Sequence, residues 1–176
     1  MVASYVQLLA RRYKNRLDAD ADEYIDFAVD GAIRMQRLIN DLLSYSRVGT
    51  RQRPRTDVVC GEIVQQALEN LKQAVAESHA EIVYEALPTV RADRSQYGQL
   101  FQNIIGNAVK FRSARPLKIE INAARENEHW LFSIRDNGVG IPADELDQIF
   151  VIFHRLHSPR AYPGTGIGLA ICKKNR

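Results

Sequence analysis

Residues 93–111 read DRSQYGQLFQNIIGNAVKF and predict one amphipathic helix. Asp93 or Ser95 is suited to cap its first turn. The apolar side chains that share one face are Leu100, Phe101, Ile104, Ile105 and Ala108. Asn103, Asn107 and Lys110 follow each other at offsets of four and three, so they share another face, turned away from the core. Amide oxygens and an ammonium suit a metal ion with a phosphate, whereas a solvated polar face is the plainer alternative.

A second pattern, residues 136–142, reads DNGVGIP and follows a predicted strand in which Trp130, Phe132 and Ile134 alternate with outward-facing side chains. Asp136 has the same parity as these apolar residues, so its carboxylate is expected on the buried face. A carboxylate there needs a hydrogen-bond donor. The exocyclic amino group of a purine is such a donor, and the glycines that follow let a flat ring approach the backbone. An ordinary turn between two elements is the alternative.

A third pattern, residues 164–168, reads GTGIG and leads into LAICKK, which predicts a glycine-rich loop at the start of a helix. Such a loop presents N–H groups and the positive end of the helix dipole to a phosphate. Its G-x-G-x-G spacing differs from the dinucleotide-binding fingerprint, and no G-K-[ST] of a P-loop occurs in the sequence. A purely structural loop is the alternative here.

The segments around these patterns predict a helical hairpin followed by a mixed layer of helices and strands. Residues 22–47 carry a seam with alternating steps of three and four, formed by Ile25, Ala28, Ala32, Met35, Ile39, Leu42 and Ser46. Residues 2–13 carry a shorter stripe of the same kind. Two helices cannot cover both stripes, so we expect a homodimer that forms a four-helix bundle.

Beyond the hairpin, the order of helices and hairpins predicts an α+β fold with helices on one face of a sheet. A further helix is predicted at 61–78, and strands are predicted at 81–86, 89–92, 117–123 and 130–134. We therefore divide the chain into a hairpin at 1–48, a linker at 49–56 and an α+β domain at 57–176.

Composition excludes several classes of protein. The chain has 176 residues, of which 45% are hydrophobic and 26% charged, so it is neither disordered nor of low complexity. No window approaches the roughly 18 apolar residues of a membrane helix, and no signal peptide is visible, so we expect a cytoplasmic protein without membrane contact. Cys60 and Cys172 fit no metal spacing and are expected to be reduced thiols.

The net charge of +3 arises entirely in residues 1–56. Four arginines crowd its end, at Arg47, Arg51, Arg53 and Arg55. A short basic run beside a proline is typical of a solvated connector, whereas a nucleic-acid surface needs basic side chains along a groove. We therefore expect no nucleic-acid partner.

Taken in order, the three patterns resemble the N, G1 and G2 boxes of sensor histidine kinases, within the Bergerat-type ATP-binding family. Residues 149–155, IFVIFHR, resemble the F box of that family. The run 150–174 is most similar to phytochrome-related kinases. The hairpin resembles the dimerisation and phosphotransfer module of these kinases, and residues 57–176 resemble their catalytic α/β sandwich domain, which binds ATP.

The resemblance implies a role for each site residue. Asp136 accepts from the adenine amino group, with Gly138 and Gly140 shaping the adenine pocket. Asn107 ligates Mg²⁺ with Asn103 beside it, and Lys110 meets the phosphates. The residues implied on the triphosphate side are Gly164, Gly166 and Gly168. Residues 141–163 form the ATP lid, anchored by Phe150 and Phe153, and Arg155 reaches the γ-phosphate.

One position separates branches of the family. The related ATP hydrolases, which include type II topoisomerases, mismatch-repair ATPases and heat-shock chaperones, carry a glutamate where Asn103 stands. An amide is no general base, so the resemblance implies transfer of the γ-phosphate to a histidine and on to the receiver domain of a response regulator. A hydrolysing ATPase of the same fold and a non-enzymatic dimeric interaction module remain the alternatives.

The acceptor histidine of the family has no counterpart in this sequence. In the family it lies on the first bundle helix, within a run resembling H-[DE]-L-x-x-P-L. The four histidines here, at His79, His129, His154 and His157, occupy other positions. We therefore expect a fragment, truncated in its hairpin and in its catalytic domain, that gains no acid-labile phosphate from ATP by itself.

Overall fold

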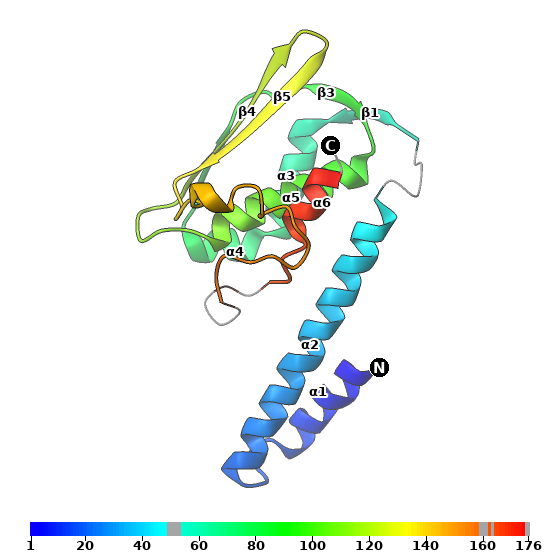
Figure 1. The fold of residues 1–176 in the computed structure, drawn as a ribbon, viewed down its shortest axis with the longest axis vertical. Helices are drawn as coiled ribbons and strands as arrows, with labels where there is room; N and C mark the ends of the chain where they lie inside the picture. The colour runs from blue at the N-terminus through cyan, green and yellow to red at the C-terminus, as the bar shows by residue number, and fades with distance from the viewer. Residues whose placement is uncertain (49–53, 159–161, 163, 175–176) are drawn as a thin grey trace. The chain divides into compact units, whose positions relative to one another are not determined.

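The computed structural model describes residues 1–48, 54–158, 162 and 164–174. The chain divides into two compact units, Met1–Ser46 and Arg47–Arg176, which are described separately (Figure 1). Of the linker predicted at 49–56, residues 49–53 lie outside the described part, and Thr56 already belongs to a strand. Among the described residues, no helix has the length and apolar character that crossing a membrane requires.

The first unit is the predicted hairpin, made of α1 (Val2–Tyr13) and α2 (Ala19–Arg47). Helix α2 begins at Ala19 because Asp18 caps it, its carboxylate accepting from the N–H of Ala21 at 2.8 Å. Lys14 pairs with Asp26 across the turn at 2.9 Å. Only Ile25 and Ala32 of α2 are buried, and α1 buries no residue.

The second unit follows the predicted α+β pattern. Its elements are β1 (Thr56–Val59), α3 (Cys60–Asn70), α4 (Lys72–Ser78), β2 (Glu81–Tyr84), β3 (Thr89–Ala92), α5 (Arg94–Lys110), β4 (Lys118–Glu126), β5 (His129–Asp136), the 3₁₀ turn η1 (Ala143–Glu145) and α6 (Gly168–Lys174). Strand β2 pairs parallel with β4, which pairs antiparallel with β5, while β1 and β3 form a separate antiparallel pair.

Two local predictions were wrong. The helix expected over 61–78 is interrupted at Leu71, whose ψ of 7° separates α3 from α4. The Leu71 side chain instead lies against Gly106 of α5, where a Cβ would be 3.7 Å from it. Strand β1 was not predicted, because its four residues carry no alternating pattern: Thr56 was assigned to the linker and residues 57–59 to the α+β domain.

The core of this unit lies between the helices and the β2–β4–β5 sheet. It is formed by apolar side chains of α3, α5, β4 and the residue before β4, chiefly Ile63, Val64, Phe101, Ile105, Leu117, Ile119 and Ile121. Figure 1 shows α5 next to α3 and α6, beneath the long β4–β5 hairpin. This packing fixes α5 as the element from which the site is built.

Candidate functional site

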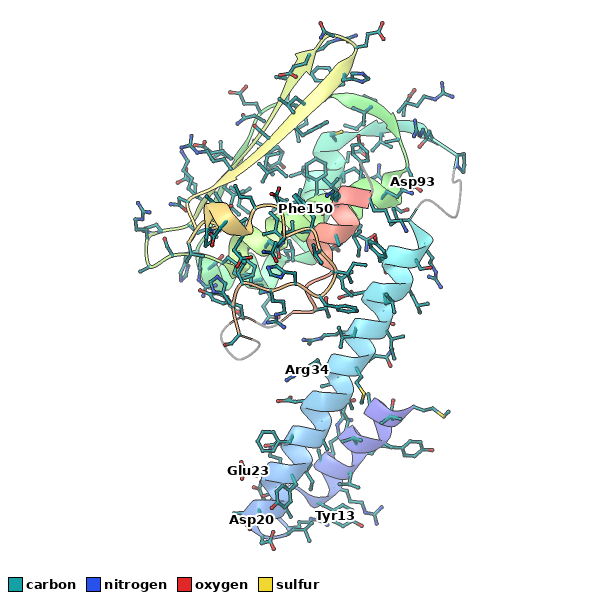
Figure 2. All side chains as sticks on the ribbon, in the orientation of Figure 1. Tyr13, Asp20, Glu23, Arg34, Asp93 and Phe150 are labelled. Atoms are coloured by element: carbon teal, nitrogen blue, oxygen red, sulfur yellow. The ribbon has the colours of Figure 1, made fainter. Side chains whose placement is uncertain are left out.

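Helix α5 presents the first set of predicted residues. Its N-terminus is held by Asp93 (labelled in Figure 2), which accepts from the N–H groups of Ser95 at 2.8 Å and Gln96 at 3.3 Å. Its buried side chains are Phe101, Ile105, Ala108 and Val109. Because that face packs into the core, Asn103, Asn107 and Lys110 remain partly exposed on the other side, as the spacing predicts.

Asn103 joins α5 to the glycine-rich loop. Its Nδ2 donates to the carbonyl oxygen of Gly168 at 3.2 Å. A Cβ on Gly168 would lie 3.8 Å from the Oδ1 of Asn103, so the loop backbone passes directly over this amide. The first and third sequence patterns therefore meet here.

Lys110 makes a second contact with the glycine-rich loop, at Gly164. Its Nζ would be only 2.8 Å from a Cβ on Gly164. Arg155 donates from its guanidinium to the carbonyl oxygens of Gly164 and Tyr162. Burial, and then the positive charge of Arg155, lower the pKa of the Lys110 ammonium below its ordinary value. Among the described residues, neither of these two cations forms an ion pair with a carboxylate.

Phe111, the residue directly after α5, contacts the second sequence pattern, residues 136–142. Its carbonyl oxygen accepts from the N–H of Val139 at 3.0 Å. A Cβ on Gly138 would lie 2.5 Å from that oxygen and 2.7 Å from Oδ1 of Asp136, a space that only glycine fits. The glycine of this turn is therefore required for the close approach of two backbones.

Asp136 lies at the end of β5, opposite Ile119 in the ladder, so its side chain is on the core face as its parity predicts. It is nevertheless exposed, because the sheet ends there. Its Oδ1 accepts from the N–H of Gly138 at 2.8 Å. Its Oδ2 accepts no hydrogen bond from the described residues.

The described part of the predicted lid is tied to Gly166. That glycine has a φ of +77°, and a Cβ on it would be 2.8 Å from the carbonyl oxygen of His154. Its own carbonyl accepts from the N–H of Phe153 at 3.2 Å. Within the lid, Nε2 of His154 lies 2.8 Å from Oε2 of Glu145. Residues 159–161 and Pro163 of the lid lie outside the described part.

The two predicted lid anchors differ. Phe150, labelled in Figure 2, lies under the ammonium of Lys173 from α6, with 5.3 Å between the nitrogen and the ring centroid. Phe153 is 55% exposed and has a φ of +68°, so its backbone bond to Gly166, and not burial of its ring, ties this residue to the domain.

Sequence reasoning missed an aromatic cluster beside the site. The rings of Phe111, His157 and Tyr162 lie 4.9 to 5.7 Å apart, and Lys110 Nζ lies 4.3 Å from the Phe111 centroid. Phe111 is distant in the sequence from His157 and Tyr162, so no local pattern predicts this cluster. The only sequence signal is the position of Phe111 directly after Lys110.

The remaining predicted site residues are Asn107 and Gly140. Asn107 is partly buried on the polar face of α5. Gly140 has a φ of +74°, and a Cβ on it would meet no atom within 4 Å. The described residues contain no cluster of three or more His, Cys, Asp or Glu side chains that would hold a metal alone.

Comparison with known proteins agrees with this geometry. The family described as histidine kinase-, DNA gyrase B-, and HSP90-like ATPase matches residues 92–176. The chain is 53% identical over 173 residues to Cyanobacterial phytochrome A of a Nostoc species and 49% identical over 173 residues to Phytochrome-like protein Cph1 of a Synechocystis species. Each alignment covers 98% of this chain and 23% of the relative, so the chain spans about a quarter of their length.

Solved structures share the fold of the hairpin and the second unit. Full-length ShkA in complex with AMPPNP matches with a TM-score of 0.66 and 23% identity, over 99% of this chain and 40% of that one. ThkA in complex with the response regulator protein TrrA matches with a TM-score of 0.66 and 21% identity, over 97% and 49%. These two structures show the fold alone. The family model and the sequence relatives identify the chain as a histidine kinase catalytic region, a helical hairpin followed by an ATPase-fold domain.

Proposed function

We propose that this chain binds ATP with Mg²⁺ and belongs to a sensor kinase that transfers the γ-phosphate to a histidine and then to a response regulator. The supporting observation is the convergence of three sequence patterns on the C-terminal half of α5 and the residue after it. Asn103 bonds Gly168, Lys110 lies against Gly164, and the Phe111 carbonyl holds the turn after Asp136. One ligand with a base at one end and phosphates at the other fits this order.

Lys110 and Arg155 form the phosphate end. Two neighbouring cations without a carboxylate partner among the described residues leave a net positive field. A triphosphate supplies the missing negative charge, and it meets the glycine-rich backbone in the same place. Arg155 already donates to the carbonyl of Tyr162 in the lid and to that of Gly164 in the glycine-rich loop, so it also ties the lid to that end.

Asp136 forms the base end. Because Gly138 N–H occupies Oδ1, the carboxylate is fixed in orientation and its Oδ2 can accept from a ligand. The exocyclic amino group of adenine donates such a bond, whereas the oxygen that guanine carries at the same ring position does not. At Gly140, where a Cβ would meet no atom within 4 Å, the backbone leaves room for the ring, whereas Gly138 lets the turn approach the Phe111 carbonyl.

The donor set fits Mg²⁺. Asn107 offers an amide oxygen, and Asn103 keeps Oδ1 for a ligand because its Nδ2 is used by Gly168. A site with few protein oxygens suits a cation that takes its other ligands from phosphates and water. The ion would neutralise charge on the β- and γ-phosphates.

Phosphate transfer is favoured over hydrolysis because an amide stands at Asn103, where a base would activate water. None of the four histidines is proposed as the acceptor. His154 lies beside Glu145 and His157 packs in the aromatic cluster, while His79 ends α4 and His129 begins β5. The acceptor, the homodimer and the receiver domain thus belong to the proposal for the whole kinase.

Titration with a fluorescent ATP analogue in the presence of Mg²⁺ tests the proposal. Asp136→Asn should weaken binding at least tenfold, because the amide's NH₂ group would face a donor. Asp57→Asn on β1 is the matched control and should bind as the wild type does. Unchanged binding by Asp136→Asn would refute the adenine assignment.

Product analysis separates transfer from hydrolysis. With ATP and Mg²⁺ alone, we expect neither steady phosphate release nor acid-labile phosphate on the chain. When a histidine-bearing hairpin is supplied in trans, acid-labile phosphate should form on that hairpin. Steady release of phosphate without an acceptor would instead favour the hydrolysing ATPase.

A further inference from the structure

Asn137, between Asp136 and Gly138, makes two hydrogen bonds through its side-chain amide. Its Oδ1 accepts from the backbone N–H of Lys118 at 2.9 Å, and its Nδ2 donates to the carbonyl of Pro116 at 2.9 Å. The two partners are an obligate donor and an obligate acceptor, so only this orientation of the amide satisfies both. We propose that Asn137 is a positioning residue that sets the base specificity of the site by acting through Asp136.

The two bonds replace the next step of the β4–β5 ladder. Ile119 faces Asp136, so the same register continued would pair Lys118 with Asn137 and Pro116 with Val139. Leu117 directs its carbonyl to β2, where it accepts from Glu81 N–H at 2.8 Å. Because backbone groups alternate in direction along a strand, Pro116 and Lys118 direct theirs to β5. The amide of Asn137 satisfies both of them.

Because the Asn137 side chain makes these two hydrogen bonds in place of the backbone, the chain after Asp136 is free to leave the sheet. The Asn137 carbonyl accepts from the hydroxyl of Ser113 at 3.3 Å instead of from Lys118. The Val139 N–H donates to the Phe111 carbonyl at 3.0 Å instead of to Pro116. The turn is thereby attached to the segment that follows α5, while the edge of β4 keeps its hydrogen bonds.

The position of the displaced backbone affects the carboxylate of Asp136, the residue before Asn137. Asp136 is the last ladder residue, and its Oδ1 is held by the N–H of Gly138, which lies on the displaced backbone. The direction of Oδ2 therefore depends on where Asn137 turns the chain. This inference rests on the proposed function, because it takes Asp136 as the acceptor for the adenine amino group.

Other side chains at this position cannot reproduce both bonds. Aspartate has no donor for the Pro116 carbonyl and places a negative charge beside it. Alanine leaves both backbone groups without their partner. Asn137→Asp is the sharper test, since it keeps the size of the side chain and the acceptor for Lys118 N–H.

The experiment measures binding of ATP and of a purine triphosphate that lacks the 6-amino group, in the wild type, Asn137→Asp and Asp136→Asn. Asn122→Asp, on the exposed side of β4, is the matched control. In the wild type, ATP should bind more tightly than the analogue. In Asn137→Asp this preference should fall about tenfold, while affinity for the analogue changes little, because one positioned hydrogen bond is lost. A merely structural role would weaken both ligands equally.

The outcomes separate the two proposals. If Asp136→Asn keeps the full preference for ATP, the adenine role of Asp136 fails and this inference fails with it. If Asp136→Asn loses the preference and Asn137→Asp keeps it, the inference alone is overturned. Fluorescence of Trp130, the one tryptophan of the sequence, reports whether each variant is folded.

A measurement on the wild type covers the case of an unfolded variant. The amide proton of Lys118 should exchange with solvent as slowly as those inside β4, although Lys118 is the first residue of that strand. Rapid exchange of this proton would overturn the proposed ladder replacement without any substitution.

Discussion

The ammonium of Lys110 is half-buried, lies against the ring of Phe111 and has Arg155 for a neighbour. In the folded chain it has no carboxylate partner among the described residues, and its pKa is lowered, first by burial and then by the charge of Arg155. The unfolded chain therefore binds this proton more tightly than the folded chain does. Between the lowered pKa and the ordinary value of 10.5, the free energy of unfolding contributed by this group rises with pH.

The same shift predicts the pH dependence of nucleotide binding. A bound triphosphate favours the charged lysine, so binding takes up a proton, and affinity should fall as pH rises through the lowered pKa of Lys110. Titration calorimetry in buffers with different ionisation enthalpies measures this uptake. Lys110→Met should lose the pH dependence and bind about tenfold to a hundredfold more weakly, because hydrogen bonds to charged groups are worth about 1.5–3 kcal/mol.

The matched control is Lys72→Met, since that lysine pairs with Glu69 on the surface. It should leave affinity and proton uptake as in the wild type. Urea unfolding should show that Lys110→Met is no less stable than the wild type. A clear loss of stability in Lys110→Met would mean that the buried ammonium supports the fold, contrary to the sign derived from its pKa.

Gly138 gives a prediction at the same scale. Because a Cβ would lie 2.5 Å from the Phe111 carbonyl oxygen, Gly138→Ala must push the turn away from α5, at about 1–3 kcal/mol of stability. ATP affinity should fall with it, since the Asp136 carboxylate is bonded to this residue. Gly98→Ala, inside α5 with no atom within 4 Å, should instead stabilise by up to about 1 kcal/mol. Equal effects of the two substitutions in chemical unfolding would contradict the crowding argument.

At the scale of the elements, we expect the contact of Gly166 with Phe153 and His154 to hold the predicted lid in place. Gly166→Ala meets a backbone carbonyl at 2.8 Å and must also adopt a φ of +77°, so the lid end at Phe153 should detach. We expect faster proteolysis between residues 141 and 158 and weaker binding of the ATP analogue. Urea unfolding should change less than for Gly138→Ala, because the described part of the lid contributes no residue to the core cluster.

The control for the lid is Gly61→Ala in α3, where a Cβ meets nothing within 4 Å. It should leave proteolysis of the lid unchanged. A lid that remains resistant in Gly166→Ala would show that its contacts with α6, such as Phe150 under Lys173, hold it without the glycine.

Elements with a strong period could be predicted from the sequence, and those decided by tertiary contacts could not. Helix α5 was expected at 93–111 and β5 around 130–134, because each has a clear apolar period. Strand β1 is formed by pairing with β3, and its four residues show no period of their own. The break at Leu71 likewise depends on a contact with α5.

The candidate site also contains residues that the sequence predicts and residues that only tertiary contacts bring together. The polar face of α5, the glycine turns and Asp136 follow from spacing and residue type. The aromatic cluster depends on rings that meet only in the folded chain. The role of Asn137 depends on the register of β4 against β5, which the sequence does not specify. A pattern thus predicts which residues bear the chemistry, whereas the fold decides which residues hold them in place.

At the scale of the whole molecule, the hairpin leaves much apolar surface uncovered. On the seam of α2, Ile25 and Ala32 are buried, whereas Met35, Ile39 and Leu42 are 55%, 54% and 48% exposed. These three follow each other at steps of four and three, so they form one stripe beyond the two buried positions. A contiguous apolar stripe of this kind marks an interface, and a second copy of the hairpin carries the same stripe.

We therefore expect a dimer that one charge on the stripe disrupts. Ile39→Glu should shift sedimentation velocity profiles from dimer to monomer at micromolar concentration, because a carboxylate in an apolar seam loses its hydration. Gln36→Glu, on the polar side of α2 where Gln36 bonds Asn40 at 3.3 Å, adds the same charge and should remain dimeric. Binding of the ATP analogue per chain should be equal in both variants, since every proposed nucleotide contact lies in the second unit. A wild type that sediments as a monomer at all concentrations would show that the stripe does not associate with its own copy.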